Sequence, residues 1–564
     1  MVHTDYDIVL NTIGQFGIFQ KKILLLLSLV SAAGGLAIVV FVFTGFEQSY
    51  RCRVDQCEPG PHQSYFREVV CNSSLDTCGD QPRLPAWYGE EGIKMEDRCR
   101  EMVVVDSECT VEKTIWIRDE ENEHLALNCD PENLIFDRSL MSSTLIEEFQ
   151  LICERSGLRA WVNVTYMVGC VVGCYLFGWI SDTFGRIKAL KLGIVLVSLS
   201  GFGGAFCSGP SGVYAFATSR FLCGIGAMAT FMVSFVLIVE HVGFKYSYVA
   251  GLLINVPFAL GEILLGVEAY LIRDWKTLQM VAYLPMLSLL LIFLTVPESV
   301  RWLLAKGRVE EAKKIIQIIA TNNRKNSNDL LDSLESNKEN KDINTEATNF
   351  GISDLLQSRK LTLRILNMSL QWFSITMCYY GLSFASTSLS RDIFTNFQLS
   401  VAIEIPGYIC CLFMIDYWGR RPVLSFCQVF SGMACITCAL LMGSENHSLI
   451  LLRLACSLVG KFGEAAAFGL VWLYTAELFP TCLRNRVCGF CALMGRLGGI
   501  TTIMLDLLKD VWVPAPVMIM GVSATMAGAC AFAFPETAGE KLPDTIEEAE
   551  YIGEKQKIDK DLHK

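Results

Sequence analysis

Twelve stretches of about twenty mainly apolar residues run through this chain of 564 residues. A helix rises 1.5 Å per residue, so each stretch can cross the ~30 Å hydrocarbon core of a bilayer. Because 52% of the residues are hydrophobic and only 19% are charged, a soluble enzyme and a disordered chain are both excluded. The sequence therefore predicts an all-α membrane protein. The predicted spans are 23–45, 159–181, 189–207, 213–239, 247–271, 276–296, 363–388, 395–415, 422–442, 449–473, 487–508 and 513–534.

The even number of spans places both chain ends on one side of the membrane. Basic residues gather in the short loops of that side, whereas the few in the opposite loops stand beside an aspartate. The positive-inside rule therefore predicts that residues 1–22 and 535–564 are cytoplasmic. The basic residues on that side are Arg186, Lys188, Lys191, Lys245, Arg420, Arg421, Arg484 and Arg486.

A long insertion, 47–157, follows the first span and carries eight cysteines. An even number of cysteines on the outer, oxidising side predicts up to four disulfides, and the sequence does not choose their pairing. Zinc binding is the alternative, but the segment holds no Cys-x-x-Cys pair. A sequon makes Asn72 the expected glycosylation site. The cysteines are Cys52, Cys57, Cys71, Cys78, Cys99, Cys109, Cys129 and Cys153.

The same insertion accounts for the acidity of the chain. It holds 24 Asp and Glu against 11 Lys and Arg, a balance of −13, whereas the whole chain carries −11. The rest of the chain is close to neutral, so nucleic acid is not an expected partner.

A second insertion, 297–361, is predicted to be cytoplasmic. Residues 310–319 have the pattern of a short amphipathic helix, and 322–349 form a polar, Asn-rich linker. The two insertions define the expected domains: an N-terminal six-helix bundle over 23–296 and a C-terminal six-helix bundle over 362–534.

An internal repeat relates the two bundles. Four features recur after the same numbered helix of each half and on the same side of the membrane. The halves are therefore parallel repeats of six helices, as in major facilitator transporters. The four pairs are Asp182-x-x-Gly-Arg186 with Asp416-x-x-Gly-Arg420, Arg220 with Arg453, Glu240 with Glu477, and Pro297 with Pro535, at offsets of 234, 233, 237 and 238.

The repeated charges at the cytoplasmic helix ends suggest a gate. Carboxylates and guanidinium groups there can form bidentate contacts that hold the cytoplasmic side shut, and the glycines allow the tight turn between helices. The alternative is that the arginines only anchor the helices at the headgroups. The predicted gating residues are Asp182, Gly185, Arg186, Glu240, Asp416, Gly419, Arg420, Glu477 and Arg484.

Several motifs together resemble the organic cation/anion/carnitine solute carriers. They cover nearly the whole chain outside the cytoplasmic linker, and a large Cys-rich loop after the first helix is also typical of that family. The resemblance implies a major facilitator fold and transport of small organic ions across the plasma membrane, with the lipid bilayer as the other partner. The motifs are Gly178-Trp-Ile-Ser-Asp-Thr-Phe-Gly-Arg186, Pro297-Glu-Ser-Val-Arg-Trp-Leu303, Asp416-Tyr-Trp-Gly-Arg-Arg-Pro422, Ala476-Glu-Leu-Phe-Pro-Thr481 with Arg484-Asn485, and Pro535-Glu-Thr-Ala-Gly539.

Charged residues deep in the predicted spans are candidates for the substrate site, because such residues are costly unless paired or functional. Lys461 and Arg496 fall near mid-membrane. At the position of Arg496, cation-carrying members of the family that this chain resembles typically have Asp, whereas anion- or carnitine-carrying members have Arg. The motif Lys461-Phe-Gly463 also looks most like the carnitine-type branch. Acidic residues also occur in the predicted spans, and a cavity that contains both positive and negative charges would suit a zwitterion such as carnitine. The acidic residues are Glu262, Glu268, Glu404 and Glu464.

Two alternatives stay open for these charges. Glu404 and Glu464 can instead pair with Lys461 or Arg496 inside the protein and never contact substrate. Glu262 and its neighbour Glu268 leave room for a quaternary or protonated amine as the substrate.

Aromatic residues of the seventh span complete the candidate site. Trp372 and Tyr379 are about two helical turns apart and share a face, so they can hold an ammonium group by cation–π attraction, with Tyr380 beside them. Core packing is the alternative. Gly381 and the Gly34–Gly35 pair lie in corresponding spans of the two halves, where we expect the helices to bend.

We therefore expect a secondary transporter of small organic ions that works by alternating access. The alternatives are an organic cation uniporter, an organic anion exchanger, and a substrate-sensing receptor without transport. Enzyme activity is not expected, because the chain holds no nucleotide-binding loop, nucleophile motif or metal cluster. No cofactor is expected, while coupling to Na⁺ or H⁺ and the oligomeric state stay open.

Overall fold

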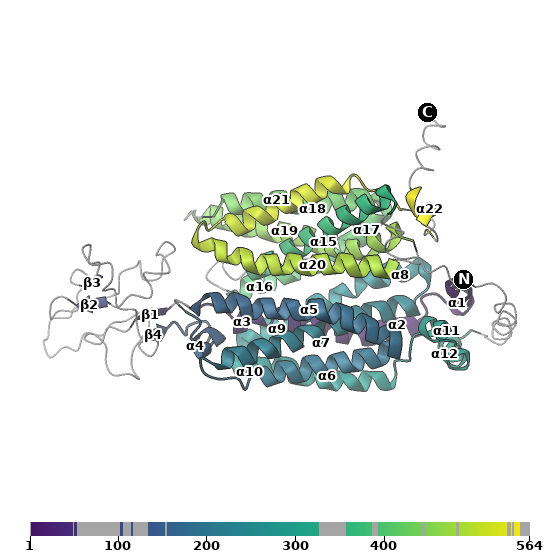
Figure 1. Cartoon of the computed structure of the whole chain (residues 1–564), viewed down its shortest axis with the longest axis horizontal. Helices are drawn as coiled ribbons and strands as arrows, with labels where there is room; N and C mark the ends of the chain where they lie inside the picture. Colours follow the sequence, from purple (N-terminus) through teal and green to yellow (C-terminus); the bar gives the residue numbers. More distant parts are fainter. Residues whose placement is uncertain are drawn as a thin grey trace, which may run out of the picture.

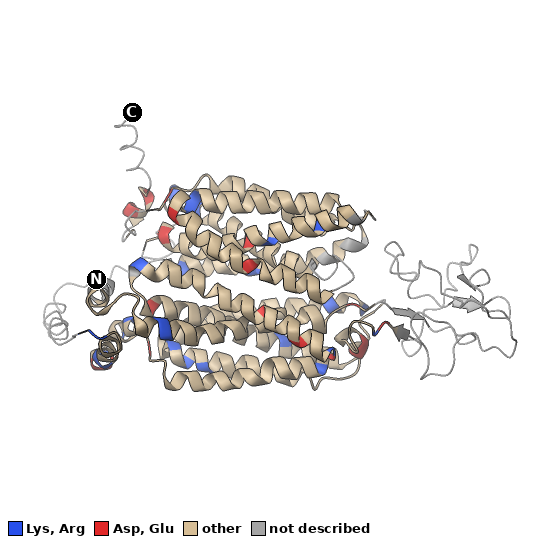
Figure 2. Cartoon of the chain, turned by 180° about the vertical axis from the view of Figure 1, so that it is seen from behind, with Lys and Arg blue, Asp and Glu red and all other residues tan. Residues whose placement is uncertain are grey.

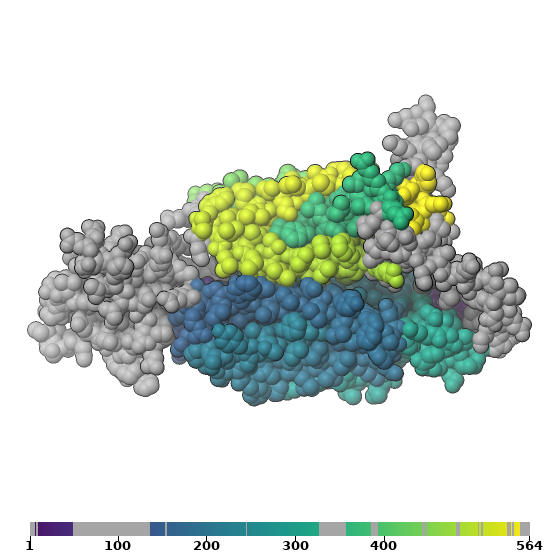
Figure 3. Space-filling model, in the orientation of Figure 1, coloured from purple at the N-terminus to yellow at the C-terminus, as the bar shows by residue number. Residues whose placement is uncertain are grey.

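Two helical bundles lie side by side in the structure, a computed structural model (Figure 1). It describes residues 2–48, 50–52, 102–104, 114–116, 134–152, 155–325, 357–385, 393–442, 446–480, 484–538, 543 and 546–552. In space-filling view the two bundles meet along one seam (Figure 3). The predicted all-α architecture of two six-helix halves is confirmed at the level of the bundles.

Each of the six predicted spans of the N-terminal bundle coincides with helix. The first span consists of α2 and α3, the fifth of α8 and α9, and the sixth of α10 and the 3₁₀ helix η5. The elements are α2 (Ile18–Val39), α3 (Phe41–Thr44), α5 (Gly157–Phe184), α6 (Arg186–Gly204), α7 (Gly212–His241), α8 (Phe244–Leu253), α9 (Asn255–Ile272), α10 (Trp275–Tyr283) and η5 (Leu284–Leu294).

The C-terminal bundle repeats this arrangement, and its second span is divided into α16 and α17. Its elements are α15 (Arg359–Ala385), α16 (Ile393–Ala402), α17 (Glu404–Trp418), α18 (Arg420–Leu440), α19 (His447–Leu478), α20 (Arg484–Asp506), η7 (Leu507–Asp510) and α21 (Ala515–Ala531). Within the described residues, ten helices are long and apolar enough to cross a membrane, and α21 is a shorter apolar helix.

The two ends of the bundles carry different additions (Figure 1). One end, here named the helical end, carries α1 (Val2–Ile13), α11 (Val300–Ala305), α12 (Val309–Asn322) and α22 (Ile546–Glu550). The α12 helix confirms the amphipathic helix predicted over 310–319, and α1 lies in a segment for which the sequence predicted no element. Figure 2 shows most of the described charged residues near the two ends of the helices.

The opposite end, here named the strand end, carries parts of the insertion 47–157. Strands β1 (Tyr50–Cys52) and β4 (Leu134–Phe136) pair antiparallel, as do β2 (Met102–Val104) and β3 (Thr114–Trp116). Helix α4 (Leu145–Phe149) follows. The side chains of the eight insertion cysteines and the residue Asn72 lie outside the described residues. The disulfides and the glycan therefore stay predictions.

Prolines explain why the fifth and eighth spans are broken. A proline ring clashes with the carbonyl four residues earlier and removes one helical hydrogen bond. Pro257 and Pro406 stand three residues after the breaks at Ile254 and Ile403. Helix α9 packs against both α16 and α17, so the two broken spans meet across the seam between the halves. By contrast, α2 and α15 run without interruption through the glycines where the sequence predicted bends.

Glycines instead allow close approach of neighbouring helices. A Cβ atom on Gly261 would lie 1.9 Å from the Ala32 carbonyl oxygen of α2, and one on Gly498 would lie 2.2 Å from the Phe373 carbonyl oxygen of α15. These glycines occupy corresponding helices of the two halves. Backbone contact therefore fixes α9 on α2 and α20 on α15.

We predict that Gly261→Ala lowers the unfolding free energy by about 1–3 kcal/mol, because the methyl group overpacks a backbone contact. Gly489→Ala is the matched control, since a Cβ there meets no atom within 4 Å. Thermal melts of the purified variants provide the measurement. Equal melting temperatures for the two variants would contradict this account of the helix contact.

Candidate functional site

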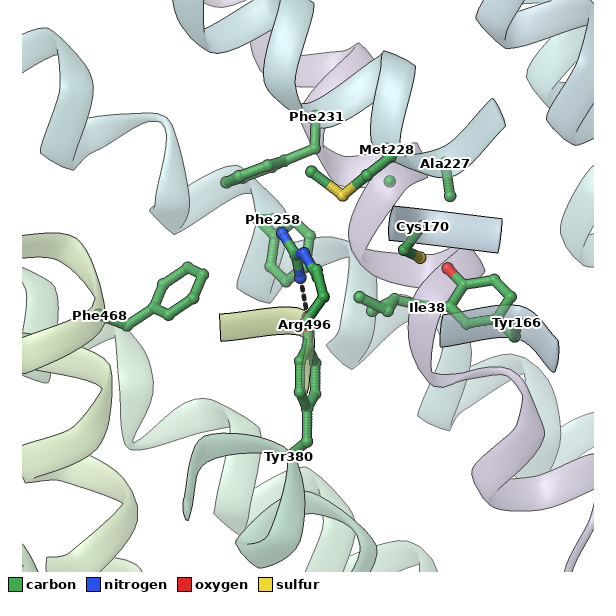
Figure 4. A pocket seen from close by; sticks show the side chains of 11 residues that line it. Ile38, Tyr166, Cys170, Ala227, Met228, Phe231, Phe258, Tyr380, Phe468 and Arg496 are labelled. Atoms are coloured by element: carbon green, nitrogen blue, oxygen red, sulfur yellow. Dashed lines mark hydrogen bonds between the residues drawn. The ribbon is translucent and has the colours of Figure 1, made fainter. Parts of the chain in front are cut away.

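A small cavity lies in the middle of the membrane-spanning region, between the two halves (Figure 4). A water-sized sphere can occupy about 20 Å³ of it, roughly the space for one water. Arg496 of α20 and Tyr380 of α15 come from the C-terminal half, and aromatic rings complete the wall. The lining residues are Gly34, Ile38, Tyr166, Cys170, Ala227, Met228, Phe231, Phe258, Tyr380, Phe468 and Arg496.

Among the described residues that line this cavity, Arg496 alone is charged. Its side chain is buried, and one Nη donates a hydrogen bond of 2.9 Å to the Tyr380 hydroxyl. Among the residues that the structure describes, the Nε atom has no hydrogen-bond partner and no carboxylate forms a salt bridge with the guanidinium. A buried guanidinium without a counter-charge is costly and suits an anionic ligand.

Lys461 has a different environment, because Glu404 neutralises it. The Lys461 Nζ lies 2.8 Å from a Glu404 carboxylate oxygen, and both side chains are fully buried. The Tyr379 hydroxyl donates to the other oxygen at 2.7 Å, and the ammonium donates to the Ser383 hydroxyl at 2.6 Å. The ammonium also lies 3.3 Å from the centroid of the Tyr379 ring. This is the arrangement of the alternative in which Glu404 pairs with Lys461 inside the protein.

Glu262 of α9 faces this network from the N-terminal half. It is fully buried, and neither carboxylate oxygen has a hydrogen-bond partner among the residues that the structure describes. It interacts electrostatically with Glu404, Lys461 and Tyr380 across the seam. Phe258, one turn earlier on the same face of α9, lines the cavity. Glu262 thus stands next to the cavity without a counter-charge of its own.

The aromatic residues predicted for the site divide into two groups. Tyr380 lines the cavity, whereas Tyr379 lies behind it, where its ring stacks on Phe468 at 5.2 Å between centroids. Trp372 lies outside the cavity lining. Its indole N–H donates to the Thr475 hydroxyl at 2.9 Å, and its ring packs edge-on against Trp472.

Sequence reasoning missed most of the cavity wall, including Phe231, Phe258 and Phe468. Single apolar residues in an apolar span carry no pattern that separates a cavity wall from a lipid-facing surface. One available signal was spacing, since Phe258 precedes Glu262 by four residues and Phe468 follows Lys461 by seven. Both spacings place the ring on the same helix face as the charge.

The predicted gating residues form an ion cluster at the helical end of each half. In the N-terminal half, Arg186 contacts Glu240 through two nitrogens, at 2.9 and 3.2 Å, and Asp182 at 2.5 Å. Glu298 accepts the backbone N–H groups of Arg186 and Ile187 at 2.9 and 3.2 Å, so it caps the start of α6. Burial raises the pKa of the Glu298 carboxyl, and these N–H groups oppose the rise. We name Arg186, Glu240 and Glu298 the N-terminal clamp.

The C-terminal half repeats the cluster with Arg420, Glu477 and Glu536, here the C-terminal clamp. Arg420 Nε lies 3.2 Å from a Glu477 oxygen. Glu536 accepts the N–H groups of Arg420 and Arg421 at 2.9 and 3.1 Å. The turns before the capped helices use Gly185 and Gly419, whose φ angles of 110° and 85° favour glycine.

Both clamps join helices within one half. The bidentate contacts that the sequence predicted are present, but Arg186 and Arg420 each pair with a glutamate of their own bundle. A polar contact between the halves at this end comes from Asp416, which accepts a hydrogen bond of 3.5 Å from the Tyr248 hydroxyl of α8. The side chain of Arg484 lies outside the described residues. The gating role of these residues stays a prediction.

Comparison with known proteins identifies the family. Residues 135–549 match the family model described as "Sugar (and other) transporter". The chain belongs to this family. The transporter is 29% identical to the organic cation transporter protein of Drosophila melanogaster, over 98% of this chain and 95% of the relative. It is 30% identical to solute carrier family 22 member 16 of Xenopus laevis, over 74% and 73% of the two chains.

Further matches agree with this assignment. A beta-alanine transporter of Drosophila melanogaster is 29% identical over 97% of this chain and 89% of the relative. The proton:xylose symporter XylE, a major facilitator protein, has a similar fold: its structure gives a TM-score of 0.57 at 20% identity, covering 72% of this chain and 92% of XylE. The protein is therefore a major facilitator transporter of the solute carrier family 22 type, and its relatives are transporters rather than enzymes.

We predict that Glu240→Gln lowers the unfolding free energy by about 1–3 kcal/mol, because the buried Arg186 guanidinium loses its charged partner inside the half and keeps only the exposed Asp182 as a counter-charge. The Arg186 side chain is only 9% exposed. Glu311→Gln is the control; its partner Arg308 is 45% exposed, and loss of such a pair costs at most about 1 kcal/mol. Thermal melts of both variants decide the matter. Equal effects would show that the N-terminal clamp does not stabilise its half.

Proposed function

We propose that this protein is a plasma-membrane transporter of zwitterions, carboxylated amines such as carnitine or a related compound. One observation carries the proposal: a buried guanidinium, Arg496, and a buried carboxyl group, Glu262, lie on opposite halves and form no ion pair with any described residue. A zwitterion neutralises both at once. A simple anion or a simple cation neutralises only one and leaves the other desolvated, which is unfavourable.

Arg496 binds the carboxylate end in this proposal. Its guanidinium presents a planar set of donors that matches a carboxylate and keeps its charge in a low-dielectric cavity. The Tyr380 hydroxyl accepts from one Nη and orients the group, while Nε stays free to donate. Lys461 adds positive potential nearby, but its own charge is already paired with Glu404.

Glu262 balances the ammonium end, and aromatic rings line the adjoining cavity. Phe231 and Phe258 pack edge-on at 5.3 Å between centroids and contribute to the cavity wall with Phe468. Faces of such rings attract ammonium groups. The Tyr379 face that the sequence suggested for this purpose lies beside Lys461, and Trp372 bonds Thr475, so we assign the ammonium end to Glu262 and these rings.

The names of the relatives support a substrate of this class. Beta-alanine is a carboxylated amine, and another relative is named as an organic cation transporter protein. Like these relatives, the protein is expected in the plasma membrane, with the helical end and both termini in the cytoplasm.

The two halves are built to move against each other as rigid units. The clamps and the close glycine contacts hold helices together within each half. Contacts across the seam include Tyr248 with Asp416 near the helical end, and Phe43 with Phe394 and Phe397 near the strand end. Both ends are therefore closed around the cavity, as in an occluded stage of alternating access.

Uptake into cells tests the carboxylate assignment. We expect wild-type protein to carry labelled β-alanine or carnitine, and Arg496→Ala to lower that uptake at least tenfold, since loss of a buried charge contact costs 2–5 kcal/mol and each 1.4 kcal/mol is a factor of about ten. Arg496→Lys keeps the charge but loses the planar fork, and should retain part of the activity. Wild-type protein that carries tetraethylammonium but neither zwitterion would contradict the proposal.

The ammonium assignment has its own signature. Glu262→Gln should lower zwitterion uptake at least tenfold but leave uptake of the anion p-aminohippurate unchanged or increased, because an anion gains nothing from this carboxylate. Glu310→Gln, at an exposed position of α12, is the control for expression and surface delivery. If Glu262→Gln reduced anion and zwitterion uptake equally, Glu262 would have a structural role instead.

A further inference from the structure

A second buried carboxylate, Glu464, lies inside the C-terminal half. It belongs to α19, three residues after Lys461, and its side chain is completely buried. Neither oxygen has a hydrogen-bond partner in the described part of the chain. Lys461 directs its ammonium to Glu404, at 2.8 Å, rather than to Glu464. An ionised carboxylate in this position would be costly unless it gained a partner.

The surroundings of Glu464 are unsuited to a metal cation. The groups that interact with it electrostatically are, besides Lys461, the thiols of Cys378 on α15 and of Cys427 and Cys435 on α18, together with the Ser431 hydroxyl. Ser431 donates its own proton to the Gly460 carbonyl at 2.8 Å. A hard cation such as Na⁺ requires several oxygen ligands, whereas a proton requires only the carboxylate itself.

A carboxyl group that is buried inside a membrane protein and has no hydrogen-bond partner is characteristic of a proton-carrying site in transporters.

We propose that Glu464 is a proton-binding carboxyl that couples transport to a proton gradient through the Lys461–Glu404 ion pair. In the occluded structure Glu464 holds a proton and is neutral, and Lys461 is free to pair with Glu404. When Glu464 releases the proton to water, its carboxylate becomes a competitor for Lys461 on the same face of α19. The electron pair stays on the Glu464 oxygen, and no oxidant or other reactant is needed.

This competition reaches the substrate cavity through Tyr379. Its hydroxyl bonds Glu404, its ring lies beside Lys461, and it stacks on Phe468, which lines the cavity. Glu404 belongs to the broken eighth span at the seam between the halves. Loss of the Lys461–Glu404 pair therefore loosens α17 from α19 at the cavity. The titratable groups around Glu464 are Lys461 on its own helix, Cys378 on α15, Cys427 and Cys435 on α18, and Glu404 on α17 behind Lys461.

Infrared difference spectroscopy of the full-length protein in membranes tests the protonation directly. At neutral pH, wild-type protein should show the carbonyl stretch of a protonated carboxylic acid, and Glu464→Gln should lose that component. Glu310→Gln, on an exposed side chain, should leave it in place. A wild-type spectrum without the band, or a Glu464→Gln spectrum that matches wild type, would overturn the assignment.

Proteoliposomes test the coupling. The probe is the labelled compound that wild-type protein carries among β-alanine, carnitine, p-aminohippurate and tetraethylammonium, and the readout is the ratio of uptake with and without an inward proton gradient. We expect several-fold stimulation for wild type and a ratio of about one for Glu464→Gln, while Glu464→Asp restores part of the stimulation. Equal ratios for wild type and Glu464→Gln would contradict the proposal.

The proton site and the zwitterion site can fail separately. Which probe is carried tests the substrate class, whereas the gradient ratio tests Glu464 with any probe. Since a ratio is measured, a variant with lower expression still gives an answer, and the infrared result does not depend on transport.

Discussion

The low dielectric of the membrane interior is the constraint on which the rest of this structure depends. A charge buried there needs a counter-charge, a ligand or a proton. Several buried charges of the described residues meet this requirement locally: Arg186 with Glu240, Arg420 with Glu477, and Lys461 with Glu404. Arg220, Glu262, Glu464 and Arg496 form no ion pair among the described residues. Arg496 lines the cavity and Glu262 lies one turn from the cavity-lining Phe258, so these two are the ones we assign to binding.

Paired and unpaired buried charges have different roles in this account: the paired ones hold each half together, and the unpaired Glu262 and Arg496 bind the ligand. Each of these ion pairs joins two helices of the same half: Arg186 with Glu240 in the N-terminal half, and Arg420 with Glu477 and Lys461 with Glu404 in the C-terminal half. The unpaired Glu262 and Arg496 lie on opposite halves. A ligand that neutralises both also supplies the attraction that brings the halves together, which gives a physical reason why closure would follow substrate binding.

The sequence predicted the positions of the helices well, because twenty-residue apolar spans and membrane-edge charges are local signals. It also identified two residues of each clamp from their repeat, Arg186 with Glu240 and Arg420 with Glu477. It did not predict that Arg186 and Arg420 pair inside their own halves, since spacing along a chain does not state which helices become neighbours. The sequence also did not predict that Glu298 and Glu536 cap the helices that follow Gly185 and Gly419, although both residues lie in the repeated segment at Pro297 and Pro535.

The candidate site was only partly predictable. Charges in apolar spans stand out, so Arg496, Lys461 and the glutamates were found, but their pairing depends on helix rotation. The helix breaks followed Pro257 and Pro406 rather than the glycines, because glycine permits close packing as readily as it permits a bend. The most direct test of the account is the thermal stabilisation of purified protein by ω-amino acids of increasing chain length. Two fixed charges predict a maximum at one length and little effect of the matching alkylamines or carboxylic acids alone; stabilisation that rises steadily with length, or that amines alone produce, would contradict it.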